Sequence, residues 1–386
     1  MSHPLEQSLK NILGDKIISN VSMPMPSPKQ ENWRHAGLSK LPILLDETEV
    51  EETPVFENII DNYIVFEGST PIKSSHKFKS ISKKTNAQLD YFSELNQHIE
   101  SDAIEVHIPE NEKLQLEIIH TDCKEKDFSA PGIIVNCGKG SKLEIIERYL
   151  YGKTKIATNS IHFEIAENAH AEHIKLIENA QTTFTTNTTT GSLGRDSSYR
   201  QANISMNGTM IRNHVTINLK GENATAAING SYITKDSEQV ENYTYINHDV
   251  AHTFSNQLYK GLLDDESRAV FSGQIKIHND AQQINSEQLN KNLILNDKAR
   301  IFTQPQLVIG ADDVKCSHGA TVGKMDEEEL FYLQSRGIEH KRAKQLLTQA
   351  FVYDVLDHFQ INTMVEFTKK KISNVLSTLP TIKGSL

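Results

Sequence analysis

Short runs of alternating apolar and polar residues dominate the middle of the chain. From about Ala103 to about Ile309, segments such as IEVHI, LQLEII, GIIVN, KLEIIERYL and IHFEI are separated by Asn, Gly, Asp and Lys. Such segments are typical of strands between turns, and helical periodicity is almost absent from this region. The pattern predicts a mainly β region over residues 101–312.

A loose internal repeat runs through the same region. A polar turn followed by a strand recurs in the segments ENEKLQL, KGSKLEI, ENAHAEH, ENATAAI, ESRAVFS and DKARIFT, which begin at Glu110, Lys139, Glu167, Glu222, Glu266 and Asp297. Three of the steps fall between 28 and 31 residues and one, of 55, is near twice that, whereas the step of 44 from Glu222 to Glu266 does not fit. A turn and strand at this spacing indicate a β-solenoid, in which each coil stacks on the next.

The stretch TTFTTNTTTGSLGRDSSYRQANISMNG is rich in Thr, Ser and Asn. It is compatible with a flexible linker or with strands of the solenoid. Because threonine is β-branched and suits a half-exposed sheet, we expect strands.

Helical patterns flank the β region. Near the N-terminus, Leu5, Leu9, Ile12 and Leu13 share one helical face, and the single tryptophan, Trp33, is expected to pack. After Gly323, three helices are expected. The sequence thus predicts a mixed, largely helical domain over 1–100, the β core over 101–312 and a helical domain over 313–386.

The C-terminal domain has clear helix signals of its own. Asp326 is expected to cap the first of its helices, which Gly337 would end. The segment EHKRAKQLLTQAFVYDVLDHF carries an apolar stripe that includes Leu347 and Phe351. We expect these helices to cap the end of the solenoid and to offer the rest of their apolar surface to a protein partner.

Composition narrows the possible functions. The net charge is -10, which makes nucleic acid an unsuitable partner. The N-terminus has no apolar signal-peptide core, and no apolar run reaches the ~20 residues that span a bilayer. The three cysteines are far apart and form no CxxC pair. We therefore expect no disulfide framework, no membrane association and a cytoplasmic location.

The segment ADDVKCSHGATVG, Ala311 to Gly323, concentrates reactive side chains. Cys316 and His318 would share one face if the segment is a strand, and thiolate and imidazole are good ligands for iron, zinc or an iron–sulfur species. Two ligands do not close a site, so the others would come from elsewhere in this chain or from another chain. The alternatives are a structural corner with Gly319 in the turn, or a Cys/His nucleophile pair. Asp312 and Asp313 are expected to cap the turn.

The run from Ser272 to Ile338 resembles the core region of the SufB/SufD family of iron–sulfur cluster assembly proteins. ADDVKCSHGATVG and LFYLQSRGI carry the resemblance, and weaker similarity extends over LNQHIESDAIEVHIPEN and over ENWRHAGLSKL, where His35 stands in the place of a usual tyrosine.

Two positions resemble the SufD side of the family more than the SufB side. Gly319 stands where SufB has a glutamate, and Ala299 stands where SufB has a cysteine. His318 matches the histidine that SufD places at the interface with SufB.

The resemblance implies a right-handed parallel β-helix between N-terminal and C-terminal helical domains. It implies a non-enzymatic scaffold subunit that pairs with a SufB-like subunit, binds a SufC-like ATPase, and forms a homodimer when isolated. A transient iron–sulfur cluster would form at the SufB interface, with His318 and Cys316 as candidate metal ligands. Contacts with partners are expected from Leu330, Phe331, Tyr332, Arg336, Leu347 and Phe351.

Two other functions are compatible with parts of this pattern. Parallel β-helices also host polysaccharide-acting enzymes, although the absent secretion signal and the KCSHGA cluster argue against such an enzyme. A SufB-type scaffold that holds the cluster itself is the other alternative, which the substitutions at Ala299 and Gly319 disfavour.

Overall fold

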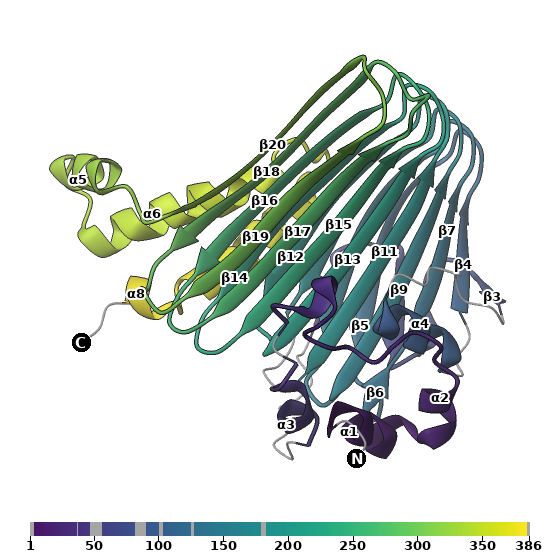
Figure 1. The fold of residues 1–386 in the computed structure, drawn as a ribbon, viewed down its shortest axis with the longest axis horizontal. Coiled ribbons are helices and arrows are strands. Elements are labelled where there is room, and N and C mark those ends of the chain that lie inside the picture. The colour runs from purple at the N-terminus through teal and green to yellow at the C-terminus, as the bar shows by residue number, and fades with distance from the viewer. Residues whose placement is uncertain are drawn as a thin grey trace.

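The computed structural model describes residues 4–36, 38–46, 56–81, 90–99, 103–124, 127–178 and 183–383. A parallel β-solenoid of about 7 turns runs through the middle of the molecule, and helices lie at both ends of the chain (Figure 1). The prediction of a mainly β protein with a parallel β-helix and flanking helices is confirmed.

Two ten-stranded sheets form the solenoid, because the chain alternates between them from one strand to the next. The first sheet, called sheet A here, has the order β2-β1-β5-β8-β10-β12-β14-β16-β18-β20, and sheet B has the order β19-β17-β15-β13-β11-β9-β7-β4-β3, with β6 paired to β9. Sheet A contains β1 (Tyr63–Glu67), β2 (Thr70–Ser74), β5 (Lys113–Thr121), β8 (Lys142–Leu150), β10 (His170–Ile177), β12 (Ser198–Met206), β14 (Thr225–Thr234), β16 (Phe254–Leu263), β18 (Ile284–Ile294) and β20 (Val314–Gly323). Sheet B contains β3 (Lys79–Ile81), β4 (Ala103–Ile108), β6 (Phe128–Ser129), β7 (Gly132–Cys137), β9 (Ile156–Ile165), β11 (Phe184–Leu193), β13 (Met210–Leu219), β15 (Gln239–His248), β17 (Arg268–Ile277) and β19 (Arg300–Ile309).

The Thr-rich stretch forms β11 and β12, as expected for solenoid strands. Every residue of β11 is buried. Because neighbouring strands are parallel and in register, like side chains stack on like. Asn159, Asn187, Asn213 and Asn242 form such a ladder inside the solenoid, with amide hydrogen bonds of 2.9, 3.0 and 3.0 Å between successive members.

The polar turns explain the internal repeat. Asn111, Asn168 and Asn223 adopt positive φ angles of 60°, 56° and 60°, a conformation that asparagine tolerates better than most residues. The irregular step of 44 arises because Glu222 precedes a strand of sheet A, β14, whereas Glu266 precedes a strand of sheet B, β17. The listed segments therefore switch from turns before sheet A strands to turns before sheet B strands at this step, while the length of each coil stays similar.

Aromatic side chains fill the solenoid interior next to glycines. A Cβ atom at Gly230 would lie 2.4 Å from Cε1 of Tyr259, and one at Gly261 would lie 2.2 Å from Cε2 of Tyr232. Both tyrosines are at most 1% exposed. The interior thus alternates large and small residues on neighbouring strands, which permits dense packing.

The N-terminal helices cover the outer face of sheet B. They are α1 (Pro4–Leu13), α2 (Asp15–Ser19), η1 (Glu31–Trp33), α3 (Leu41–Asp46) and α4 (Tyr91–His98). The predicted apolar face of the first helix is confirmed, since Leu5, Leu9 and Leu13 are buried against a cluster that includes Phe184 of β11 and Met210 of β13.

A buried arginine joins these helices to the sheet. Arg212 of β13 is 1% exposed and makes ion pairs with Asp90 (3.1 Å) and Glu241 (2.5 Å). Its guanidinium lies 3.6 Å from the ring centroid of Trp33 and 4.0 Å from that of Tyr243. Burial alone would raise the pKa of Asp90, but the nearby imidazole of His214, whose Nδ1 lies 3.9 Å from Oδ2, and the charge of Arg212 hold that pKa well below its usual value. The tryptophan packs, as predicted.

The C-terminal helices lie along the outer face of sheet A. They are α5 (Glu327–Ser335), α6 (His340–Tyr353), η2 (Asp354–Leu356), α7 (Asn362–Leu376) and α8 (Pro380–Lys383). The Asp326 cap is confirmed, since its carboxylate accepts from the amides of Glu328 and Glu329, and Gly337 follows with φ of 83°.

Our expectation that these helices cap the end of the solenoid is wrong. Their apolar side chains, among them Val352 and Ile372, pack with Ile146, Ile174 and Ile204 on the flank of sheet A. Sheet A carries apolar residues on both faces, so its outer face offers a wider apolar surface than the end coil does. The end coil is left uncovered (Figure 1).

Replacing Arg212 with methionine is expected to destabilise the protein by about 3–5 kcal/mol, because Asp90 and Glu241 would be left as buried, uncompensated carboxylates. Urea denaturation followed by circular dichroism measures the change. The matched control is Arg195→Met, because that side chain is 61% exposed and pairs only with its neighbour Asp196; it should shift stability by no more than about 0.5 kcal/mol. Equal stability of the two variants would contradict the structural role of Arg212.

Candidate ligand site at the open end of the solenoid

The last coil of the solenoid has an unpaired edge. Within the described residues, β20 pairs only with β18, and β19 pairs only with β17. Most residues of β20 are exposed, and the edge carries exposed apolar side chains such as Phe302 (40%), Val308 (44%) and Val322 (53%). The solenoid therefore extends to Gly323, beyond residue 312.

Cys316 and His318 lie on the same face of β20, as expected for a strand. Their register partners on β18 are Ser286 and Gln288, which are at most 2% exposed inside the solenoid. Because parallel strands in register point equivalent side chains the same way, Cys316 and His318 face the solenoid interior at its open end. Cys316 is half-buried and His318 is exposed. The alternative of a corner is wrong, since Gly319 lies within β20 and pairs with Leu289.

A chain of hydroxyl groups leads from the interior to Cys316. The imidazole of His248 contacts Thr253 Oγ1 through Nδ1 (2.7 Å) and Ser255 Oγ through Nε2 (2.9 Å). Ser255 Oγ lies 2.5 Å from Ser286 Oγ, directly beneath Cys316. Burial lowers the pKa of His248 to about 4, so this imidazole is neutral at pH 7.

The thiol of Cys316 itself is partly shielded from water. Burial raises the pKa of Cys316, and a backbone hydrogen bond from Ser286 opposes that shift. Its side chain also packs with Ile284, Ala311 and Val314. At neutral pH the thiol is therefore mostly protonated, and binding of a metal would release that proton.

Gln288 lies beneath His318 and has polar atoms without partners. Its side chain is fully buried, and neither Oε1 nor Nε2 makes a hydrogen bond. Across the interior its carboxamide lies against Gly273 of β17, where a Cβ would approach Nε2 to 2.2 Å. Buried polar groups of this kind are normally satisfied by water or a ligand.

The site has too few ligands to hold a metal ion alone. No group of three or more His, Cys, Asp and Glu side chains comes together for a metal anywhere in the described ranges. Cys316 and His318 supply two donors, whereas a closed site needs about four. Asp312 and Asp313 lie exposed in the turn before β20, where the backbone amide of Asp313 donates to Gln282 Oε1 (2.9 Å).

The expected partner-binding residues fall into two groups. On α5, Phe331 and Tyr332 are 71% and 57% exposed, and Arg336 stacks 5.3 Å from the ring centroid of Tyr332. Leu330 is buried. Leu347 and Phe351 of α6 are half-buried, and Lys260 lies 4.8 Å above the Phe351 ring. The exposed aromatic pair on α5 is thus the part of this set that is open to a partner.

Sequence reasoning missed a charged cluster inside the solenoid. Glu147 makes contacts with His120 (2.9 Å), His173 (3.1 Å) and Lys175 (3.3 Å), and all four side chains are at most 1% exposed. Burial would raise the pKa of Glu147, but Lys175 and the two histidines hold it well below the usual value. Glu147 lies two residues from Ile145 and from Tyr149, so all three side chains share the inner face of β8.

The chain belongs to the family described as "SUF system FeS cluster assembly, SufBD core domain", which matches residues 119–351. Iron–sulfur cluster assembly protein SufD of Escherichia coli is 34% identical over 227 residues, which cover 58% of this chain and 53% of that protein. An iron–sulfur cluster assembly SufBD family protein of Synechocystis is 31% identical over 298 residues, 74% of this chain and 66% of that protein. SufD of Bacillus subtilis is 34% identical over 184 residues, 47% of this chain and 41% of that protein.

These matches span 41% to 66% of the relatives' own length. The family match covers most of the solenoid and part of the C-terminal helices. Membership of this family favours a role in iron–sulfur cluster assembly over the alternative of a polysaccharide-acting enzyme. No helix in the described part of the chain is long and apolar enough to cross a membrane.

The three cysteines are expected to differ in reactivity. Burial raises the pKa of Cys137 to about 12 and its side chain is 2% exposed, so its thiolate is negligible at pH 8. Titration with a thiol reagent at pH 8 should therefore label the half-buried Cys123 and Cys316 in the folded protein and Cys137 only after denaturation. Labelling of Cys137 at the rate of Cys123 in the native state would contradict the fold.

Proposed function

We propose that this chain is a non-enzymatic scaffold subunit of a cytoplasmic complex that assembles iron–sulfur clusters. The observation that carries the proposal is the placement of His318 and Cys316 on the interior face of an unpaired terminal strand. A nascent cluster is the cargo of this site, and the chain supplies only part of its ligands.

A second subunit completes the site in this proposal. Partner strands added to the edges of β19 and β20 would satisfy their free backbone groups and cover Phe302 and Val322. Such docking would place ligands of the partner opposite His318. The partner is a SufB-like subunit, because Gly319 and Ala299 supply no ligand atoms where the SufB pattern has glutamate and cysteine. A second copy of this chain would fit the same edge but would leave the ligand set incomplete.

The C-terminal helices provide the second docking surface. Phe331 and Tyr332 are large, exposed aromatic residues on a helix that contacts the rest of the protein chiefly through α6. Aromatic anchors of this kind dominate the binding energy of protein interfaces. We assign this surface to a SufC-like ATPase. Since α6 packs against β16, motion of the ATPase would reach the solenoid flank two strands from β20.

Replacing His318 with alanine should leave partner assembly intact and reduce cluster formation on the complete complex by roughly ten-fold or more, because a ligand is lost at an exposed position that adds little to the core. Cluster formation is measured by anaerobic reconstitution and absorption. Cys316→Ser serves as the comparison and should reduce cluster formation less.

Normal cluster assembly by His318→Ala would refute its role as a ligand. A larger loss from Cys316→Ser than from His318→Ala would reverse the ranking of the two residues.

Replacing Phe331 with glutamate should abolish ATPase binding without affecting the fold, because 71% of this side chain is already in solvent. A pull-down of the ATPase measures the effect. Phe254→Glu is the matched control, since Phe254 is also an exposed phenylalanine (43%) but begins β16. Undiminished binding by Phe331→Glu, or equal loss from both variants, would move the docking site elsewhere.

A further inference from the structure

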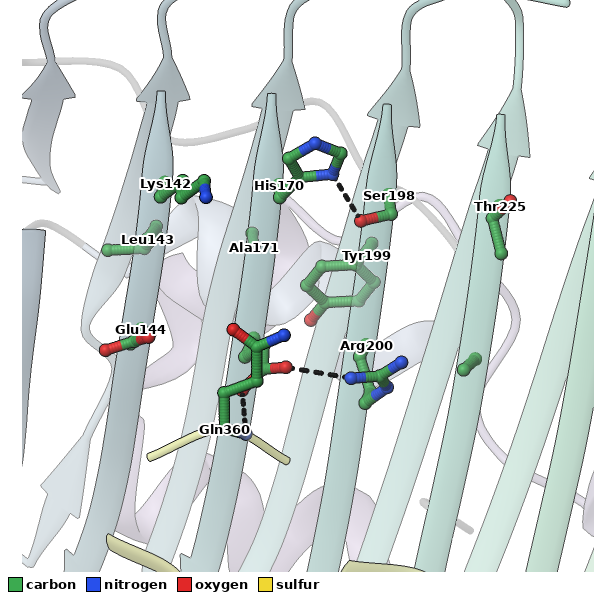
Figure 2. A pocket seen from close by; sticks show the side chains of 12 residues that line it. Lys142, Leu143, Glu144, His170, Ala171, Ser198, Tyr199, Arg200, Thr225 and Gln360 are labelled. Atoms are coloured by element: carbon green, nitrogen blue, oxygen red, sulfur yellow. Dashed lines mark hydrogen bonds and ion pairs between the residues drawn. The ribbon is translucent and has the colours of Figure 1, made fainter. Parts of the chain in front are cut away.

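A pocket on the outer face of sheet A lies apart from the open end of the solenoid. Its volume is about 300 Å³, and its walls come from β8, β10, β12 and β14. Gln360, from the connection between η2 and α7, forms the remaining wall, and Figure 2 shows its side chain in front of these strands. The pocket therefore lies where the solenoid meets the C-terminal domain.

A row of hydrogen-bonding side chains crosses the pocket. Lys142, His170, Ser198 and Thr225 occupy equivalent register positions on four adjacent strands (Figure 2). His170 Nδ1 lies 2.7 Å from Ser198 Oγ, which leaves Nε2 of the ring for a ligand. Lys142 is exposed and makes no ion pair with any other described residue. Lys142 is the register partner of His170 on the adjacent strand, and burial and the charge of Lys142 lower the pKa of His170.

Each of the two carboxylates of the pocket already forms an ion pair with a basic side chain. Glu144 pairs with Lys113 (2.9 Å) and accepts from Gln115 Nε2 (2.7 Å). Glu172 pairs with Arg200 (2.8 Å) and accepts from the backbone amide of Gln360 (2.8 Å). Three cations therefore face two carboxylates, and the surplus charge is that of Lys142.

We propose that this pocket binds a phosphate group, either free or carried by a small metabolite. The ammonium of Lys142, the hydroxyl of Thr225 and the Nε2–H group of His170, which is present when Ser198 donates its hydrogen to Nδ1, are suitable donors to a tetrahedral oxyanion, whose oxygens point in several directions. Donors on adjacent strands are about 4.8 Å apart, so one phosphate can contact two or three of them at once. The volume exceeds that of phosphate alone and leaves room for the organic part of a phosphomonoester.

The site joins the solenoid to the C-terminal helices. Arg200 contacts the carbonyl of His358, and Glu172 holds the amide of Gln360, so two residues of the pocket already fix this connection. A phosphate bound beside Gln360 would restrict the connection further. Binding should therefore slow amide hydrogen exchange over residues 357–361.

The test is isothermal titration calorimetry of the full chain with inorganic phosphate and with ribose 5-phosphate. We expect saturable binding at one site, roughly ten-fold or more weaker in Lys142→Met. Lys139→Met is the control, because Lys139 is a nearby lysine that pairs with Glu167 at 3.1 Å; it should bind like the unmodified protein. Tighter binding of ribose 5-phosphate would identify a phosphomonoester as ligand, and equal binding would identify free phosphate.

Three results would overturn the proposal. They are the absence of saturable binding for both probes, an unchanged affinity in Lys142→Met, and an equal loss in Lys139→Met. Saturable binding without slower exchange over residues 357–361 would place the phosphate outside this pocket and would overturn the proposal as well.

Discussion

In-register parallel pairing between successive coils determines the direction of almost every side chain in this protein. A shift of one residue in any coil would exchange the inner and outer faces of its strands. The interior row of Gln257, Gln288 and His318 shows the consequence. His318 points inward because each residue beneath it does, so the orientation of the last strand is inherited from the coils before it. A site built in this way needs no local loop to position its side chains.

The N-terminal and C-terminal helices pack on opposite sheets of the solenoid. The N-terminal helices cover sheet B and the C-terminal helices cover sheet A, through separate apolar clusters. Both flanks are thereby protected from water along much of their length. The end coil is the part of the solenoid that retains exposed apolar side chains and unpaired backbone groups, and it also carries Cys316 and His318. The candidate metal ligands and the unpaired strand edges thus lie together at one end of the solenoid.

Much of the fold was predictable from the sequence, because turns and strands follow local rules. The polar turns of the repeat correspond to turns in the structure, with asparagines at positive φ angles. Asp326 correctly indicated the start of α5. The position of the C-terminal helices was not predictable in the same way. In KLEIIERYL, Ile145 faces the solenoid interior and Ile146 faces the C-terminal helices. Because apolar residues lie on both faces of this strand, the sequence shows no alternation from which the helix-covered face could be identified. The spacing of Cys316 and His318 was enough to predict that they share one face. The row formed by Lys142, His170, Ser198 and Thr225 could not be predicted in this way, because it depends on the register between four strands.

Pro305 stands in the middle of β19, opposite Gly273 of β17. Proline lacks an N–H group, and an edge strand accepts it where the missing donor would face away from the neighbouring strand. The open edge of β19 therefore cannot extend into an uninterrupted ladder with another chain. A solenoid with a free end is at risk of stacking end to end into fibres, and a central proline on that edge limits growth. Any strand that pairs along the β19 edge would therefore lack one backbone hydrogen bond at Pro305.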